Sequence, residues 1–194
     1  GAEADDGTDV LRMWEWERVR QMPFQIDAWL PADAAVLLVR VRLVNHHDRT
    51  VPAYWWSNIA VPETPDSRVL APARDSYHLH RETMELHPYP IDRGVDVSYP
   101  VNSPRSGDRF YRIAPGQFPW VASVNGRGEG FFHASTSRLT GRKLWVFGQR
   151  PGGRQWQDYL NTPGHPYIEL QGGLTRTQAE CKPMPAGACW EWVE

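Results

Sequence analysis

Proline and glycine interrupt this chain so often that they limit the secondary structure it can form. The sequence holds 17 prolines and 16 glycines in 194 residues. Proline lacks a backbone donor and glycine weakens the interior of helices and strands, so both residues divide a chain into short elements. The segments between them alternate apolar and polar residues or are rich in β-branched and aromatic residues. We therefore predict an all-β antiparallel sandwich of roughly a dozen short strands.

One segment departs from this pattern. Trp156, Tyr159 and Leu160 recur at helical spacing, and Pro163-Gly164 would stop the run, so we predict a short helix near residues 154–161, packed over a sheet. The proline-rich residues 82–107 show no pattern and are predicted to form a long connection.

The predicted domain organisation is simple. Residues 1–9 are small and acidic and are expected to be a linker or cloning remnant, followed by a single domain over residues 10–194. A strand pattern at residues 190–194 runs to the last residue without a turn, which suggests a domain excised from a longer chain.

The charge balance excludes two classes of partner. With 21 basic and 23 acidic residues the net charge is −2, which gives no electrostatic basis for binding nucleic acid or an anionic membrane. No apolar run approaches the roughly 20 residues of a membrane span. The N-terminus is no signal peptide, and we expect a cytoplasmic protein.

The motifs and cysteines indicate no cofactor. We find no P-loop, dinucleotide fingerprint, nucleophile elbow or zinc-protease motif, and we expect neither a cofactor nor a metal. Cys181 and Cys189 flank a predicted turn, so they form either a hairpin disulfide or two reduced thiols. Two cysteines without adjacent histidines do not make a zinc site.

The best candidate for a binding surface is the strand that begins at Tyr167. Tyr167, Glu169 and Gln171 leave one side of it, while Ile168 and Leu170 leave the other and belong to a core. An aromatic ring, a carboxylate and a carboxamide in a row suit a polyhydroxylated ligand. The alternative is a half-exposed strand with a solvated glutamate. Gly172-Gly173 then leaves bare backbone, for a bulge or for the close approach of another group.

Two further segments carry candidate site residues. Trp56 and Asn58 project together from a strand predicted over residues 51–62. His78 and His80 share one side of another strand, and imidazole exchanges protons near neutral pH. The alternative for both histidines is a satisfied or surface position.

Three blocks of the sequence resemble a bacterial family, the DUF5107 domain. They are YWWSNIAVPE (54–63), LTGRKLWVFG (139–148) with Trp156 following, and YIELQGGL (167–174) continuing through Thr177-Gln178 to Trp190-Glu191-Trp192. The family is similar to the galactose-mutarotase superfamily. This resemblance implies an antiparallel β-supersandwich with a carbohydrate-binding sheet, here short enough to lack N-terminal strands. It also implies a carbohydrate ligand and tetratricopeptide repeats after this domain in the parent chain.

Two classes of function follow from these observations. In an aldose 1-epimerase-like enzyme, Glu169 would be the base and His78 or His80 the acid. Trp56 or Trp156 would stack on the sugar, and Asn58 and Gln171 would hold its hydroxyls. A glycoside hydrolase would instead need a second carboxylate, from Glu63 or Glu82. The other class is non-catalytic: a carbohydrate-binding or interaction module, or a structural domain whose tryptophans all belong to the core.

Overall fold

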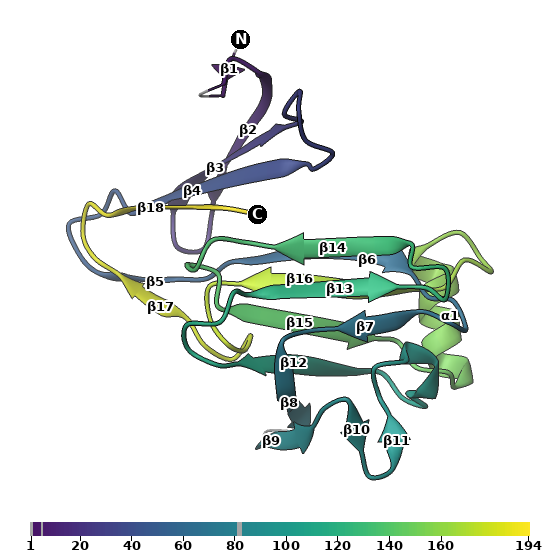
Figure 1. Ribbon diagram of the computed structural model, residues 1–194. Coiled ribbons are helices and arrows are strands. Elements are labelled where there is room, and N and C mark those ends of the chain that lie inside the picture. Colours follow the sequence, from purple (N-terminus) through teal and green to yellow (C-terminus); the bar gives the residue numbers. More distant parts are fainter. Residues whose placement is uncertain (1, 5, 81–82) are drawn as a thin grey trace. The chain divides into compact units, whose positions relative to one another are not determined.

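The computed structural model describes residues 2–4, 6–80 and 83–194 (Figure 1). The strands are β1 (Ala2–Glu3), β2 (Asp9–Glu17), β3 (Met22–Trp29), β4 (Leu38–Val44), β5 (Val51–Ala53), β6 (Trp56–Pro62), β7 (Arg68–Leu70), β8 (Ala73–His80), β9 (Thr83–Pro88), β10 (Ile91–Asp92), β11 (Val95–Asp96), β12 (Gly107–Ile113), β13 (Trp120–Val124), β14 (Gly130–Ala134), β15 (Gly141–Val146), β16 (Tyr167–Gly173), β17 (Lys182–Met184) and β18 (Cys189–Val193). The helices are the 3₁₀ turn η1 (Pro100–Asn102) and the α-helix α1 (Pro151–Leu160). The predicted antiparallel all-β class is confirmed.

The chain folds into two compact units. Unit 1 contains residues 1–54, 135–138 and 181–194, and unit 2 contains residues 55–134 and 139–180. In unit 1, an antiparallel sheet has the strand order β1-β2-β3-β4-β18, and β5 pairs with β17. The C-terminal strand pairs with β4 from Cys189 opposite Val44 to Val193 opposite Arg40. Cys181 and Cys189 are free, exposed thiols.

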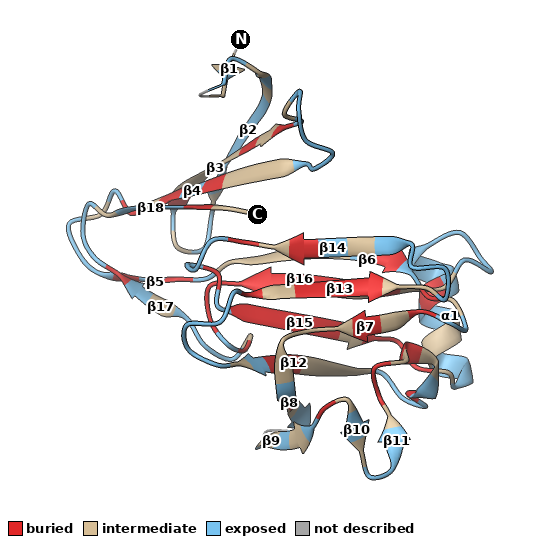
Figure 2. Cartoon of the chain, viewed as in Figure 1, coloured by how far each residue is buried: buried red, intermediate tan, exposed pale blue. Residues whose placement is uncertain are grey.

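Unit 2 is built around a sandwich of two antiparallel sheets, and β10 and β11 form a separate antiparallel pair. The larger sheet has the order β6-β16-β15-β12-β8-β9, and the smaller has the order β14-β13-β7. Fully buried Val69 and Val121 from the small sheet pack in one core with fully buried Leu144, Ile168 and Leu170 from the large one. Figure 2 shows the resulting run of buried residues along β13, β15 and β16. Six paired strands therefore present one face to this core and leave the other face for a site.

Two predicted segments are divided more finely than expected. The strand predicted over residues 51–62 is two strands, β5 and β6. The connection predicted over residues 82–107 contains β9, β10, β11 and η1, so it is more structured than a plain connection. Strands of two residues leave no readable alternation, and prolines mask the rest.

The predicted helix is confirmed, but it begins earlier and buries a different side. Pro151 occupies the first turn, where its missing N–H costs nothing. The stripe formed by Trp156, Tyr159 and Leu160 is exposed, at 59%, 78% and 54%. Gln157 is the buried residue of α1, at 2% exposure. In the described parts of the chain, no helix is both long enough and apolar enough to span a membrane.

Candidate functional site

Glu169 lies in β16, between β6 and β15 in the large sheet. Ile168 and Leu170 are fully buried on the core side of the strand, and Glu169 projects from the opposite face. There its Oε2 atom accepts hydrogen bonds from Asn58 Nδ2 and Gln171 Nε2, each at 3.0 Å. The structure thus brings together three of the residues that the sequence singled out.

The Gln171 amide belongs to a directed chain of hydrogen bonds that ends at Glu169. Lys143 Nζ donates to Gln178 Oε1 at 2.6 Å, and Gln178 Nε2 donates to Gln171 Oε1 at 2.8 Å. An ammonium only donates and a carboxylate only accepts, so the two ends determine the direction of every bond between them. Lys143 is itself buried and lies 2.6 Å from the Asp108 carboxylate. Within the described residues, no donor reaches the second carboxylate oxygen of Glu169, Oε1.

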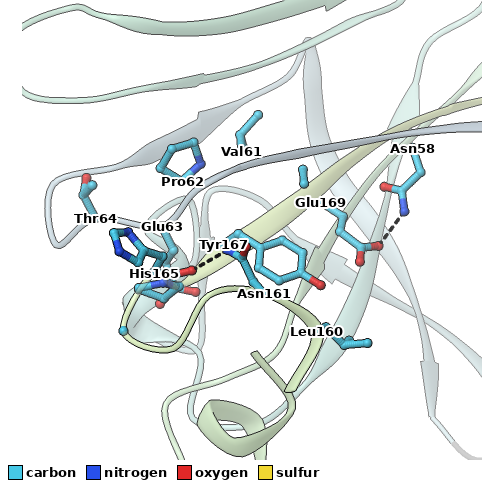
Figure 3. Close-up of a pocket in the computed structure, with 13 residues that line it drawn as sticks. Asn58, Val61, Pro62, Glu63, Thr64, Leu160, Asn161, His165, Tyr167 and Glu169 are labelled. Carbon is cyan, nitrogen blue, oxygen red and sulfur yellow. Dashed lines mark hydrogen bonds between the residues drawn. The ribbon is translucent and has the colours of Figure 1, made fainter. Parts of the chain in front are cut away.

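Two hollows meet at Glu169. The first, of about 690 Å³, lies along β6 and is also lined by Asn58, Tyr167, His165 and Glu63. Figure 3 shows Asn58 and Glu169 on one side of it, His165 and Glu63 on the other, and Tyr167 between them. Burial raises the pKa of Tyr167, and the charge of Glu169 raises it further. The carboxylate is therefore close enough to act on groups within this hollow.

The second hollow, of about 840 Å³, is walled by aromatic rings. Trp145, Phe147 and Trp156 line it together with Glu169. The Phe147 ring packs against Trp145 with centroids 6.0 Å apart and against Tyr167 at 4.9 Å. Trp156 comes from α1, and its exposed indole is free to cover an apolar surface. Aromatic walls beside a carboxylate suit a ligand with C–H faces and hydroxyls.

Trp56 shares this face of the sheet, but it lines neither hollow. Its ring lies over two glycines: a Cβ added at Gly173 would come within 2.3 Å of it, and one at Gly141 within 2.7 Å. It also meets the edge of Phe110 with centroids 5.9 Å apart. The close approach predicted at Gly172-Gly173 exists at both glycines: Trp56 approaches Gly173, and a Cβ added at Gly172 would come within 2.6 Å of the His133 ring.

Glu63 lines the first hollow, but its carboxylate is bound by side chains of α1 and of the loop that precedes α1. Its carboxylate, in a side chain that is 1% exposed, lies 3.1 Å from Arg154 Nη2 and accepts from Gln149 Nε2 at 2.7 Å. Gln157 reaches the same carboxylate at 3.4 Å and donates to the Tyr167 carbonyl at 2.7 Å. These bonds attach α1 to the edge of the large sheet, which explains why the polar side of α1 is buried. Glu82, the other predicted partner for hydrolysis, lies outside the described residues.

The predicted acids are not near Glu169. Arg109 lies opposite Leu144, on the core side of the large sheet, and its Nη1 contacts His78 Nε2 at 2.9 Å. His78 and His80 therefore project from the face opposite to Glu169. Burial, with Arg109 and His87 nearby, lowers the pKa of His78 to about 4. His80 is exposed and lies 3.7 Å from Glu85. The structure thus separates the predicted base from both predicted acids.

Comparison with known proteins places the chain in a family. Residues 2–185 match a family described as a domain of unknown function, DUF5107. The chain belongs to the DUF5107 family. This confirms the resemblance drawn from the three sequence blocks.

Solved structures similar to this DUF5107 domain share its fold at low identity. A TPR-domain-containing protein from Parabacteroides distasonis superposes with a TM-score of 0.77 at 20% identity, covering 96% of this chain and 33% of that one. A putative aldose 1-epimerase from Escherichia coli K12 gives 0.71 at 15%, covering 100% and 65%. A galactose mutarotase-like protein from Clostridium acetobutylicum gives 0.64 at 9%, covering 98% and 62%. The DUF5107 domain thus has the galactose mutarotase-like sandwich fold and spans between a third and two thirds of these chains.

Sequence reasoning missed several residues that line or support the site of this DUF5107 domain. They are Lys143, Trp145, Phe147, His165 and Gln178, with Arg105 and Arg150 at the second hollow. For Lys143 and Trp145 a signal existed, because both alternate with buried Leu144 in β15. The others lie in loops or after strand ends, where alternation gives no direction.

Proposed function

We propose that unit 2 of this DUF5107 domain binds a saccharide on the face of the large sheet that carries Glu169. The observation that carries the proposal is the open Oε1 atom of Glu169, which lies between two hollows lined by aromatic side chains. Sugar hydroxyls would donate to this oxygen, and aromatic rings would cover the C–H faces. Hollows of several hundred cubic ångströms are of the size that small ligands occupy.

The amide chain supports the proposal because it holds the carboxylate ready before a ligand arrives. Asn58 and Gln171 both bond to Oε2, so the orientation of the carboxylate is set by two donors. A group that is already oriented loses less conformational entropy when it binds.

Titration calorimetry against galactose, glucose and related sugars tests the proposal. We expect binding by the intact chain and at least a tenfold weaker affinity in Glu169→Gln, since hydrogen bonds to charged groups are worth about 1.5–3 kcal/mol. Glu129→Gln, a change at an exposed loop carboxylate, is the control. Equal affinities for the two variants would remove Glu169 from the binding site.

Anomer interconversion is a second candidate, favoured by one observation: Glu169 and His165 line the same hollow. Glu169 would take the proton of the anomeric hydroxyl while an acid such as His165 protonates the ring oxygen and the C1–O5 bond breaks. Closure of the open-chain aldehyde on its other face would give the other anomer. Exchange of anomers measured by NMR separates the candidates, because binding without exchange leaves a non-catalytic module.

The larger context is also a proposal. Because a TPR-domain-containing protein shares this fold, we propose that the saccharide-binding domain acts beside tetratricopeptide repeats in its parent chain. Its cytoplasmic location stays a prediction. Mass spectrometry of the protein purified from its source would show whether such repeats are attached.

A further inference from the structure

The second hollow has a charged wall that the proposed function does not use. Arg105 and Arg150 line it together with Glu169, Trp145 and Trp156. Both arginines are exposed. Among the residues that the structure describes, neither guanidinium has an ion-pair or hydrogen-bond partner.

The backbone holds these two arginines side by side. The amide of Gln149 donates to the Ser103 carbonyl at 3.0 Å, and the amide of Arg150 donates to the Pro104 carbonyl at 3.2 Å. At Gly148, where φ is +83°, an added Cβ would lie 2.4 Å from the carbonyl carbon of Arg105. The two segments are therefore in direct contact, and their arginines line one hollow together.

Their lack of partners contrasts with three other arginines of unit 2. Arg112 is paired with Asp75, Arg154 lies 3.1 Å from Glu63, and Arg68 lies 3.6 Å from Asp96. Two neighbouring like charges without a counter-ion repel each other, and an anion between them would relieve that repulsion. Guanidinium groups also match carboxylate and phosphate oxygens with paired N–H donors.

We propose that the saccharide bound at the Glu169 face carries an anionic substituent, a uronate carboxylate or a phosphate ester, which Arg105 and Arg150 bind. The inference rests on the proposed function and adds the substrate class. Glu169 would repel the same substituent, so the ligand has one allowed orientation: hydroxyls toward the carboxylate and the anion toward the arginines.

Paired sugars test this proposal by titration calorimetry on the intact chain. The pairs are galactose with galacturonate, and glucose with glucose 6-phosphate, each at low and at high ionic strength. We expect one charged member to bind at least about tenfold tighter than its neutral partner at low salt, and less so at high salt. The pair that shows this preference identifies the substituent: a carboxylate if it is the galacturonate pair, and a phosphate if it is the glucose 6-phosphate pair.

Variants assign this preference to the two arginines. In the Arg105→Gln/Arg150→Gln double variant both members of a pair should bind alike, whereas Arg74→Gln, a change at another exposed arginine of unit 2, should keep the preference. Glu169→Gln should weaken both members. Circular dichroism checks that each variant is folded.

Four outcomes would overturn the inference. Equal binding of charged and neutral sugars overturns it and leaves the proposed function intact, and so does a preference that survives in the double variant. Inorganic phosphate binding as tightly as glucose 6-phosphate would assign the arginines to a free anion. Absence of binding by every sugar would overturn the proposed function together with the inference.

Discussion

Two carboxylates line the first hollow, and their surroundings are opposite in kind. Glu63 is 4% exposed and has a cation, Arg154, beside it together with the amides of Gln149 and Gln157. Glu169 is half-buried, and its hydrogen-bond donors among the described residues are the neutral amides of Asn58 and Gln171. One carboxylate is paired with a cation of the protein, and the other has an oxygen that accepts no hydrogen bond from the residues that the structure describes.

The contrast separates a structural role from a binding role. A buried charge stays in a fold only when it is paired and hydrogen-bonded, so the partners of Glu63 account for its presence. The amides at Glu169 are neutral, so they orient its carboxylate without pairing it with a positive charge. The carboxylate can therefore still attract hydrogen-bond donors of a ligand. The pairing of Glu63 with Arg154 therefore favours a structural role for Glu63 over that of the second carboxylate that glycoside hydrolysis requires.

Breaking the Glu63 pair should have the largest effect. Glu63→Ala leaves Arg154 without its partner and Gln149 and Gln157 with unused donors, so we expect the free energy of unfolding to fall by about 3 kcal/mol. Urea denaturation followed by tryptophan fluorescence measures the change. Glu129→Ala, at an exposed loop, should cost no more than about 0.5 kcal/mol. A loss at Glu63 as small as the loss at Glu129 would contradict its structural role.

Removing the charge of Glu169 should give the reverse result. Glu169→Gln keeps the shape of the side chain, so we expect its free energy of unfolding to stay within about 0.5 kcal/mol of the parent. Saccharide binding should weaken by about 2 kcal/mol, because the charge-assisted hydrogen bonds are lost. Denaturation and calorimetry on one preparation check both values. A large loss of stability would show that Glu169, like Glu63, serves the fold.

Trp156 tests the binding role of this face at a residue that would contact the ligand directly. Its indole is 59% exposed and lines the second hollow, so Trp156→Ala should weaken saccharide binding by about 1 kcal/mol with little change in stability. Tyr159→Ala is a matched control, because its ring packs against Trp156 at 5.8 Å but does not line either hollow. If both variants bind alike, Trp156 is not a stacking platform.

The sequence predicted what is local and missed what depends on pairing between strands. Alternation along Tyr167–Gly173 correctly separated the buried Ile168 and Leu170 from the polar side of that strand. Alternation also placed His78 and His80 together. It could not show whether they lie on the same face of the sheet as Glu169, because β8 is separated from β16 by β15 and β12, and register is set by long-range pairing.

Helix α1 shows a second limit. Apolar spacing predicted that Trp156, Tyr159 and Leu160 would pack on a sheet, yet all three are exposed. The buried carboxylate of Glu63 reverses the orientation, because it requires Arg154 and Gln157 on the inner side of the helix. That requirement comes from a residue far away in sequence, and no pattern within the helix reveals it.

The smallest expected effect tests whether the amide chain matters for binding at all. Gln178→Ala removes the donor that holds Gln171 Oε1, while Lys143 keeps its contact with Asp108, so the fold should be almost unaffected. Gln171 would then be free to rotate, and one of the two bonds that orient Glu169 would weaken. We expect saccharide binding to weaken by about 0.5–1 kcal/mol, the worth of one neutral hydrogen bond.

Calorimetry measures this loss, and Gln117→Ala, a change at an exposed turn, is the control. Equal affinities for these two variants would mean that Glu169 is oriented by Asn58 alone and that the chain from Lys143 belongs to the packing of the sheet.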